Sequence, residues 1–213
     1  MKRKNQLGST IGLHVKQQKS LYLFVTVLFM MGVIFGSLIV NALDPTQKEG
    51  LLHYLGYFFQ GLKQDSIADS SIALQHSAGD HLKTIGLMWI LGLSVIGIPL
   101  LLIFIFIKGL VIGFTVGFLV NQLSWQGLWF AFVSVVPQNL LIIPALIIVT
   151  VAGINFSKDL VRNRLIHHRG RIYPQFVSFC ILVTGMAAVL MISSLFEAFL
   201  SPQIMKELIP TLN

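Results

Sequence analysis

Few side chains in this 213-residue chain are placed to do chemistry. Cys180 is the only cysteine, which excludes an internal disulfide or a cysteine-based zinc site. It lies in an apolar run without a basic neighbour, which favours a small buried hydrophobe over a reactive thiolate. His167 and His168 are adjacent and lack the i,i+4 spacing and the third ligand of a helical zinc site, so lipid contact is favoured. Because no G-x-S-x-G, H-E-x-x-H or P-loop motif is present either, we expect no enzyme activity, no metal and no cofactor.

The most unusual polar pattern lies inside an apolar run, where Pro137, Gln138 and Asn139 are followed by Pro144. Two prolines free backbone carbonyls, and the adjacent amides could satisfy them. The favoured interpretation is a kinked helix whose polar groups are satisfied internally. The alternative is a broken helix that lines a substrate path, as in transporters. Glu197 is the one candidate for an acid at membrane depth, and we expect it at the outer interface rather than in a proton relay.

The composition predicts the kind of domain in which these residues lie. Hydrophobic residues make up 55% of the chain, charged residues only 11%, and the mean hydropathy is +0.81, whereas soluble domains carry about 25% charged residues. We therefore expect one all-α integral membrane domain without a soluble catalytic domain. The formal charge of +7 does not indicate nucleic acid as a partner, because the basic residues flank apolar runs and do not form a stripe on a soluble face.

Five apolar runs predict five transmembrane helices, and the short third run is the least certain of them. If all five cross, residues 1–20, Lys108 and loop 157–173 share one side and hold eleven of the fifteen Lys and Arg residues. If the third run were re-entrant, the basic loop would change sides and the asymmetry would disappear. The positive-inside rule therefore predicts a cytoplasmic N-terminus, a cytoplasmic loop 157–173 and an extracytoplasmic tail 201–213. The predicted spans are about 21–43, 84–107, 109–123, 128–156 and 174–200.

Outside the membrane, the longest polar segment is residues 44–83. Asp44 and Pro45 suit a helix start, and the apolar residues that follow recur at helical spacing. This predicts an extracytoplasmic amphipathic helix that either lies on the membrane surface or binds a partner. Residues 65–80 are expected to form a loop or a weak helix. The apolar positions of the amphipathic helix are Leu51, Leu55, Phe58 and Leu62.

Small residues also recur at intervals of four within the predicted spans. Such spacing allows helix backbones to approach closely in lipid. Packing within the chain is the favoured role, and docking of a helix from another membrane protein is the alternative. The residues in this pattern are Gly32, Gly36, Gly109, Gly113 and Gly117.

Four stretches carry a resemblance to a known family: SLYLFVTVLFMMGVIFGSLIVNAL, PTQKEGLLHYLGYFFQ, WILGLSVIGIPLLLIFIFIKGLVIGFTVGFLV and VVPQNLLIIPALI. They resemble the stage II sporulation protein M family of endospore-forming Bacilli, essentially from end to end. The resemblance implies a multi-pass protein of the mother-cell membrane at the sporulation septum. It implies stage II sporulation proteins D and P, two peptidoglycan hydrolases, as partners.

The function implied by this resemblance is a non-enzymatic membrane scaffold. It would anchor and localise a peptidoglycan-remodelling complex for septal wall thinning and forespore engulfment. The wider superfamily often carries a glutamate in the span that matches 137–144, where this chain has Gln138, Asn139 and Ile143. That departure counts against the alternative function, a small-solute or ion transporter or channel built around Pro137–Pro144. The oligomeric state stays open.

Overall fold

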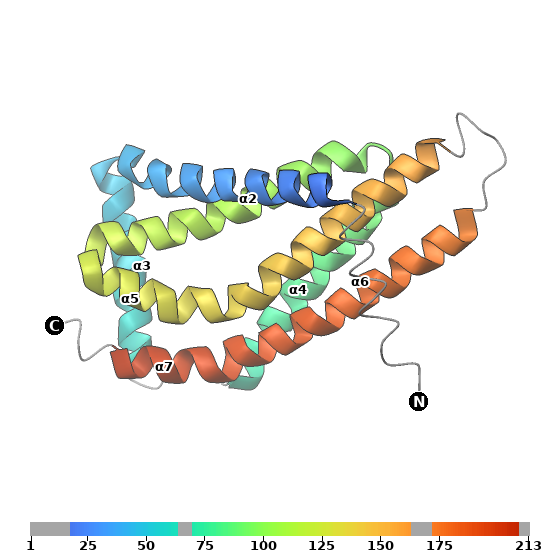
Figure 1. Cartoon of the computed structure of the whole chain (residues 1–213). Coiled ribbons are helices and arrows are strands. Elements are labelled where there is room, and N and C mark those ends of the chain that lie inside the picture. The colour runs from blue at the N-terminus through green and yellow to red at the C-terminus, as the bar shows by residue number, and fades with distance from the viewer. Residues whose placement is uncertain (1–17, 64–69, 163–171, 209–213) are drawn as a thin grey trace.

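The computed structural model describes residues 18–63, 70–162 and 172–208, and all regular structure in these ranges is helical (Figure 1). This confirms the all-α prediction for the part of the chain that is described. The elements in chain order are α2 (Lys19–Ile39), the 3₁₀ turn η1 (Val40–Ala42), α3 (Pro45–Lys63), α4 (Ser70–Gly92), α5 (Gly97–Val161), α6 (Ile172–Leu195), the π-helical turn η3 (Phe196–Leu200) and α7 (Ser201–Leu208).

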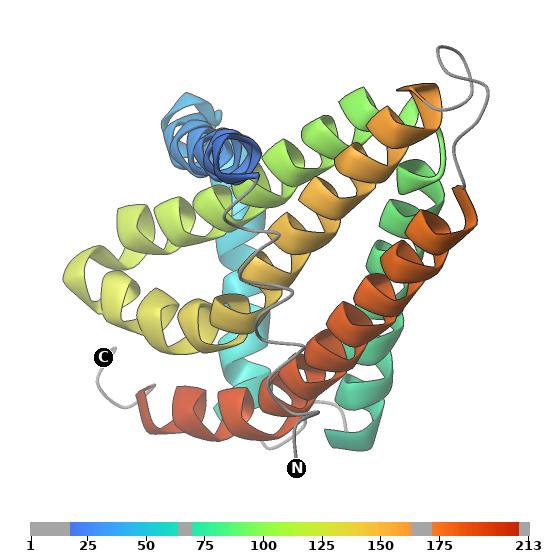
Figure 2. The same cartoon turned by 45° about the vertical axis from the view of Figure 1, so that its right-hand side comes forward.

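Helix α5 is a hairpin of two helical arms, 97–123 and 125–161. The reversal is at Ser124, whose φ of 52° and ψ of −129° are the only non-helical dihedral angles in α5. Just after it, Gly127 lies so near the first arm that an added Cβ would come within 2.6 Å of the Leu119 carbonyl carbon. The glycine therefore lets the two arms lie side by side directly after the turn (Figures 1 and 2).

The reversals of the chain gather at two ends of the bundle (Figure 1). Helix α3, the Ser124 reversal and α7 lie at one end, which we call the α3 end. The start of α2, the turn at residues 93–96, the end of α5 and the start of α6 lie at the opposite end, which we call the 93–96 end. Helices α2, α4 and α6 and the two arms of α5 run between these ends.

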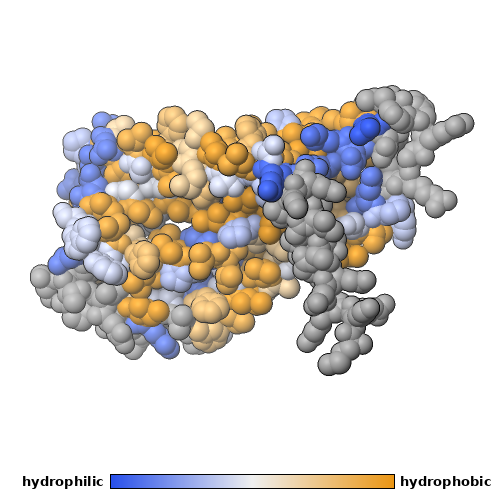
Figure 3. Space-filling model, in the orientation of Figure 1, coloured by the Kyte–Doolittle hydropathy of each residue, from blue (hydrophilic) through white to orange (hydrophobic). Residues whose placement is uncertain are grey.

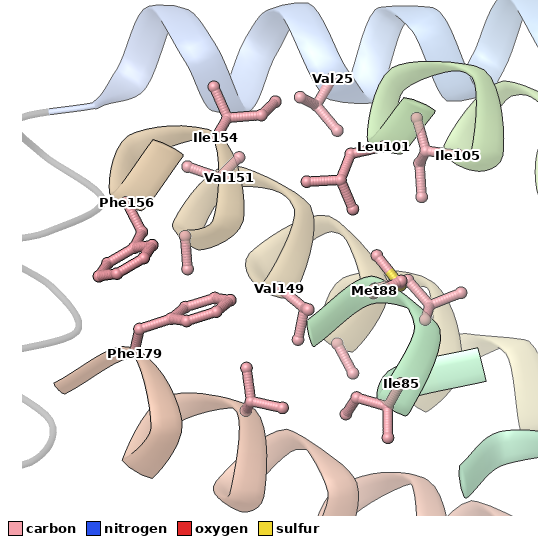
Figure 4. Close-up of a cluster of buried hydrophobic side chains, with 14 of the residues drawn as sticks. Val25, Ile85, Met88, Leu101, Ile105, Val149, Val151, Ile154, Phe156 and Phe179 are labelled. Atoms are coloured by element: carbon pink, nitrogen blue, oxygen red, sulfur yellow. The ribbon is translucent and has the colours of Figure 1, made fainter. Parts of the chain in front are cut away.

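The second arm of α5 is the centre of the bundle. Most residues from 145 to 157 are buried around the whole circumference of the helix, as expected where neighbours cover every face. Figure 4 shows the core around it, with side chains from α2, α4, the first arm and α6. The Phe156 and Phe179 rings stack with centroids 5.3 Å apart, which joins the second arm to α6.

Between its two ends, the face of the bundle seen in Figure 3 is largely apolar. Helix α2 buries only a narrow stripe and exposes large side chains such as Leu23 and Ile34. A contiguous apolar surface of this kind is typical of contact with lipid. By length and composition, three segments of the described chain can cross a membrane: Lys19–Ala42, Gly97–Val161 and Tyr173–Met205. These findings support a membrane protein, although they identify three candidate segments rather than five.

The predicted boundaries of the second and third spans are wrong. Residues 84–107 do not form one helix, because α4 ends at Gly92 and α5 begins at Gly97. Lys108 lies within the first arm rather than between two helices. Pro99 falls in the first turn of α5, where its missing N–H leaves no hydrogen bond unmade, so it does not kink a helix there.

The turn at 93–96 has no charged residue and depends on close packing. An added Cβ on Gly97 would lie 2.5 Å from the Leu91 carbonyl carbon, so only glycine fits this position. The buried Ser157 hydroxyl, from the second arm, donates to the Gly92 carbonyl at 2.8 Å and lies 3.0 Å from the Ser94 carbonyl. The second arm thus supplies a donor for the Gly92 carbonyl at the end of α4, while the Ser94 carbonyl also accepts from the Gly97 N–H.

Segment 44–83 is more helical than expected. Helix α3 begins at Pro45, in agreement with the prediction, and Gln47 Oε1 accepts a hydrogen bond from the Asp44 N–H. The residues expected as a loop or a weak helix are helical from Ser70 onwards and form the first turns of α4. The last predicted span is continued beyond α6 by η3, and residues 201–208 of the predicted tail form α7.

Candidate functional site at the α3 end

Helix α3 packs across the α3 end of the bundle through the apolar face that the sequence predicts. Leu55 and Phe59 pack against a small core formed by Leu119, Phe130 and Ala131. The Phe59 and Phe130 rings meet edge to face, with centroids 5.3 Å apart. Leu55 is therefore engaged within the chain, where burial of apolar surface holds α3 against the two arms of α5.

A cavity of about 510 Å³ lies between α3, both arms of α5 and the η3–α7 segment. We call it the α3 cavity. Its wall is mostly apolar, with a few polar groups on the side of the second arm and η3. This is the composition of a site that accepts a mainly apolar group and orients it by a few polar contacts. The lining residues are Leu51, Tyr54, Leu55, Phe58, Phe114, Thr115, Phe118, Leu119, Phe130, Ser134, Val135, Gln138, Glu197, Ser201 and Met205.

Glu197 is the charged group of this cavity, and it connects two elements. The Ser77 hydroxyl donates to Glu197 Oε2, and His81 Nε2 lies 3.5 Å from the same oxygen. These contacts join α4 to η3 near the α3 end of the bundle; the expectation that Glu197 lies at the outer interface stays a prediction. Ser77 and His81 were missed because residues 65–80 were expected to form a loop or a weak helix and His81 directly follows them, although their i,i+4 spacing would place them on one helix face.

Gln138 lies at the boundary of the cavity and is incompletely satisfied. Its backbone carbonyl accepts a hydrogen bond from the Ser193 hydroxyl at 3.1 Å, whereas its side-chain Oε1 is buried without a partner among the described residues. A small cavity of about 10 Å³ lies beside Ser134, Pro137 and Gln138. That volume is roughly the minimum for one water molecule.

The helix is not broken between Pro137 and Pro144, which agrees with the favoured interpretation and not with the alternative of a broken helix. Helix α5 continues through both prolines with helical dihedral angles, and its one interruption is at Ser124. Figure 1 shows that the second arm bends without breaking. The Asn139 amide bonds to the Val135 carbonyl at 2.8 Å within the same helix. Around Pro137, the Val135 carbonyl accepts from the Asn139 side chain and the Gln138 carbonyl accepts from Ser193 of α6, which are the kinds of donor that accompany prolines in membrane helices.

The other predicted residues of α3 with described side chains lie on its inner face. Leu51 and Phe58 line the α3 cavity with Leu55, while the side chain of Leu62 lies outside the described residues. The opposite face exposes Leu52 and Tyr57, with 69% of Tyr57 accessible. The sequence pattern did not identify this outward face as a docking candidate, because Leu52 and Tyr57 lie among polar residues on the polar side of the amphipathic helix.

The five predicted glycines come together in one interface between α2 and the first arm of α5. On Gly36, Gly109 and Gly113 an added Cβ would meet backbone atoms of the facing helix within 3.2 Å. Gly32 faces Phe106 and Leu110 in the same way, and Gly117 faces Ser37. The glycines therefore serve packing within the chain, the favoured of the two predicted roles, and the facing helix covers them.

In this interface, the residue numbers of the facing pairs increase in the same direction along both helices. Gly109 lies against Phe29, and Gly113 lies against Val33. Helix α2 and the first arm therefore run parallel, although α3 and α4 separate them in the sequence. Near the α3 end the Asn121 amide donates to Asn41 Oδ1 at 3.3 Å and extends the contact.

Metal chemistry has no candidate within the described ranges, where no group of three or more His, Cys, Asp or Glu residues is close enough to hold an ion. Cys180 is half-buried and free. His167 and His168 lie outside the described residues.

Comparison with known proteins gives one match. The family model described as stage II sporulation protein M matches residues 25–202, from within α2 to the start of α7. The match therefore includes α3, both arms of α5 and Glu197. No curated protein and no solved structure matches the chain.

Proposed function

The chain belongs to the stage II sporulation protein M family, which implies a role in sporulation, and from this premise we propose a non-enzymatic membrane scaffold. The scaffold anchors a peptidoglycan-remodelling complex to the mother-cell membrane at the sporulation septum. Its proposed partners are stage II sporulation proteins D and P, and its proposed task is septal wall thinning and engulfment. The family is not known as a family of enzymes.

The proposed topology has five crossings: α2, α4, the two arms of α5, and α6. The distribution of charge supports it, because the segments adjoining the 93–96 end carry ten basic residues while the α3 end carries three, Lys48, Lys63 and Lys206. By the positive-inside rule, the 93–96 end faces the cytoplasm and the α3 end faces the wall. A C-terminal reporter that is active only outside the cytoplasm tests this orientation. The ten basic residues are Lys2, Arg3, Lys4, Lys16, Lys19, Lys158, Arg162, Arg164, Arg169 and Arg171.

The observation that carries the scaffold proposal is the placement of α3. Its inner face is fixed to the bundle through Leu55 and Phe59, so its outer face is held in a defined position on the proposed wall side. That outer face presents Leu52 and Tyr57. Exposed aromatic and aliphatic residues on a rigid helix are typical anchors of protein–protein interfaces.

The test replaces the outer face of α3 without touching its inner face. The double variant Leu52→Ala, Tyr57→Ala should abolish recruitment of fluorescently tagged D and P proteins to the septum, while the level of the protein in the membrane stays unchanged. Tyr173→Ala is the matched control, because Tyr173 is a tyrosine with 77% exposure at the opposite end of the bundle. Normal recruitment by the double variant would refute the proposed docking face.

The α3 cavity is the observation that favours the second candidate function, transport of a small solute or ion. It contains a carboxylate, Glu197, and an amide with an unsatisfied oxygen, Gln138. Proteoliposomes that contain only the purified chain would distinguish the two functions. Solute or ion flux that Glu197→Gln removes would favour transport, and absence of flux together with septal recruitment would favour the scaffold.

A further inference from the structure

The structure places Lys108 inside a helix, whereas the sequence predicted it at the boundary between two spans. It lies eleven residues after Gly97, the first residue of α5, which places its Cα about 16 Å along the first arm at 1.5 Å per residue. The first arm continues for fifteen more residues to the reversal at Ser124. Lys108 is therefore near the middle of a helix and not at its end.

The packing of α2 gives the same depth independently. Gly109, the next residue along the first arm, faces Phe29 and Val33 of α2. These residues lie midway along the candidate membrane-spanning segment Lys19–Ala42. Two elements thus place the lysine near the centre of the apolar layer, where charged side chains are rare and generally serve a function.

No carboxylate in the described part of the chain forms an ion pair with Lys108. The one contact recorded for its ammonium group is the ring of Phe104, one turn back on the same helix, with Nζ 5.6 Å from the ring centroid. A cation–π contact of this length compensates only part of the loss of water. The lysine is half-buried, and its neighbours Ile107 and Val111 are 47% and 53% exposed, so this side of the arm is open.

We propose that Lys108 docks a transmembrane helix of another protein that carries an Asp or Glu at mid-membrane depth. This rests on the scaffold function proposed above and names the chemistry of one contact. The partner helix would lie along the exposed stripe formed by Ile103, Ile107 and Val111, with its carboxylate against the ammonium group. Such an ion pair is strong in lipid because water does not compete for either charge.

A second copy of this chain is a poorer occupant. The described acids are either engaged or located at an end of the bundle. Asp80 pairs with Lys83 at 3.5 Å, and Glu197 contacts Ser77 and His81. Asp44 and Glu49 belong to the start of α3, and Asp159 lies in the last turn of α5.

The test uses the full chain and a synthetic probe in phosphatidylcholine vesicles. The probe is a Leu/Ala transmembrane peptide of about 20 residues with one central Asp, and the reference peptide has Leu at that position. Energy transfer between the labelled chain and each peptide measures association. We expect the Asp peptide to bind the unmodified chain roughly 10-fold more tightly than the Leu peptide.

Three variants make the result specific. Lys108→Met keeps the length of the side chain and should remove the preference for Asp, while Lys108→Arg should retain it. Lys83→Met, at a lysine already paired with Asp80, should bind like the unmodified chain. A preference that is absent in the unmodified chain, or that survives in Lys108→Met, would overturn the proposal. Energy transfer between two labelled copies that Lys108→Met abolishes would overturn the assignment to another protein.

This assay contains no sporulation protein other than the chain, so it can fail independently of the scaffold proposal. If the unmodified chain shows no preference for the Asp peptide but septal recruitment is normal, only the Lys108 contact is refuted. A retained preference together with normal septal recruitment by the α3 double variant leaves the Lys108 contact standing and removes the α3 docking face.

Discussion

The glycine interface between α2 and the first arm allows the sharpest test of the packing. In Gly113→Ala the new Cβ would lie 2.7 Å from Val33 Cα and 2.6 Å from its carbonyl carbon, whereas ordinary contacts begin at 3.4 Å. The nearest atom is the Val33 carbonyl oxygen at 2.0 Å, so the helices would have to separate by about 1.4 Å, because backbone atoms cannot rotate away as a side chain can. Overpacking of this kind costs about 1–3 kcal/mol, and the better helix propensity of alanine offsets at most about 1 kcal/mol of it.

The matched control is Gly86→Ala, because Gly86 is a helical glycine in α4 with no neighbouring atom within 4 Å of an added Cβ. That variant should keep the gain in propensity without the clash. The free energies of unfolding of the two variants should therefore differ by about 2 kcal/mol, as measured by detergent-induced unfolding in mixed micelles followed by tryptophan fluorescence. Equal stability of Gly113→Ala and Gly86→Ala would show that α2 and the first arm do not meet in this register.

Two other positions give predictions of opposite sign. Ser124→Gly should raise the free energy of unfolding by about 1 kcal/mol, because glycine adopts a φ of 52° without the strain that serine bears there; unchanged or lower stability in the same micelle assay would contradict a strained reversal. Ser157→Ala should lower stability by about 1–3 kcal/mol, because it leaves the carbonyl of buried Gly92 without the hydroxyl that donates to it. Its effect should also appear as faster hydrogen exchange around residues 93–96, and normal exchange there would argue against the hydroxyl as a lock on this turn.

The glycine interface was largely predictable from the sequence. A four-residue spacing of glycines in two apolar runs has few roles other than close packing of backbones. Which glycines face each other was not predictable, because Gly109 and Gly113 meet Phe29 and Val33 across a long separation in the sequence. The spacing of small residues identifies the packing face of a helix, but it does not identify the helix that this face contacts.

The second and third spans were misassigned because hydropathy does not detect a turn made of apolar residues. Leu93–Ile96 contains no charge, so the run 84–107 looked continuous and Lys108 looked like a boundary. The available signal was Gly97 followed by Pro99, a glycine at a close approach and a proline in a first helical turn. The Ser157 hydroxyl that completes the turn lies more than sixty residues away and has no local signature.

The contacts of Glu197 with Ser77 and His81 could not be predicted, because the start of α4 is polar in sequence. Ser77 and His81 lie in a stretch rich in polar residues, which reads as a loop when considered alone. In the folded chain it is helical, and Ser77 contacts Glu197 of η3, 120 residues further along the chain. The acid was recognisable from the sequence, but the α3 cavity around it depends on how α3 crosses the bundle.

The parallel pairing of α2 with the first arm has a consequence for biosynthesis. Asn41 and Asn121, which extend this interface, are separated by 80 residues. At about 5–20 residues per second, the ribosome needs roughly 4–16 s to translate that interval. During this time the glycine face of α2 is already made while its own partner in the first arm is not, so that face is open to other helices until residues 97–123 are synthesised.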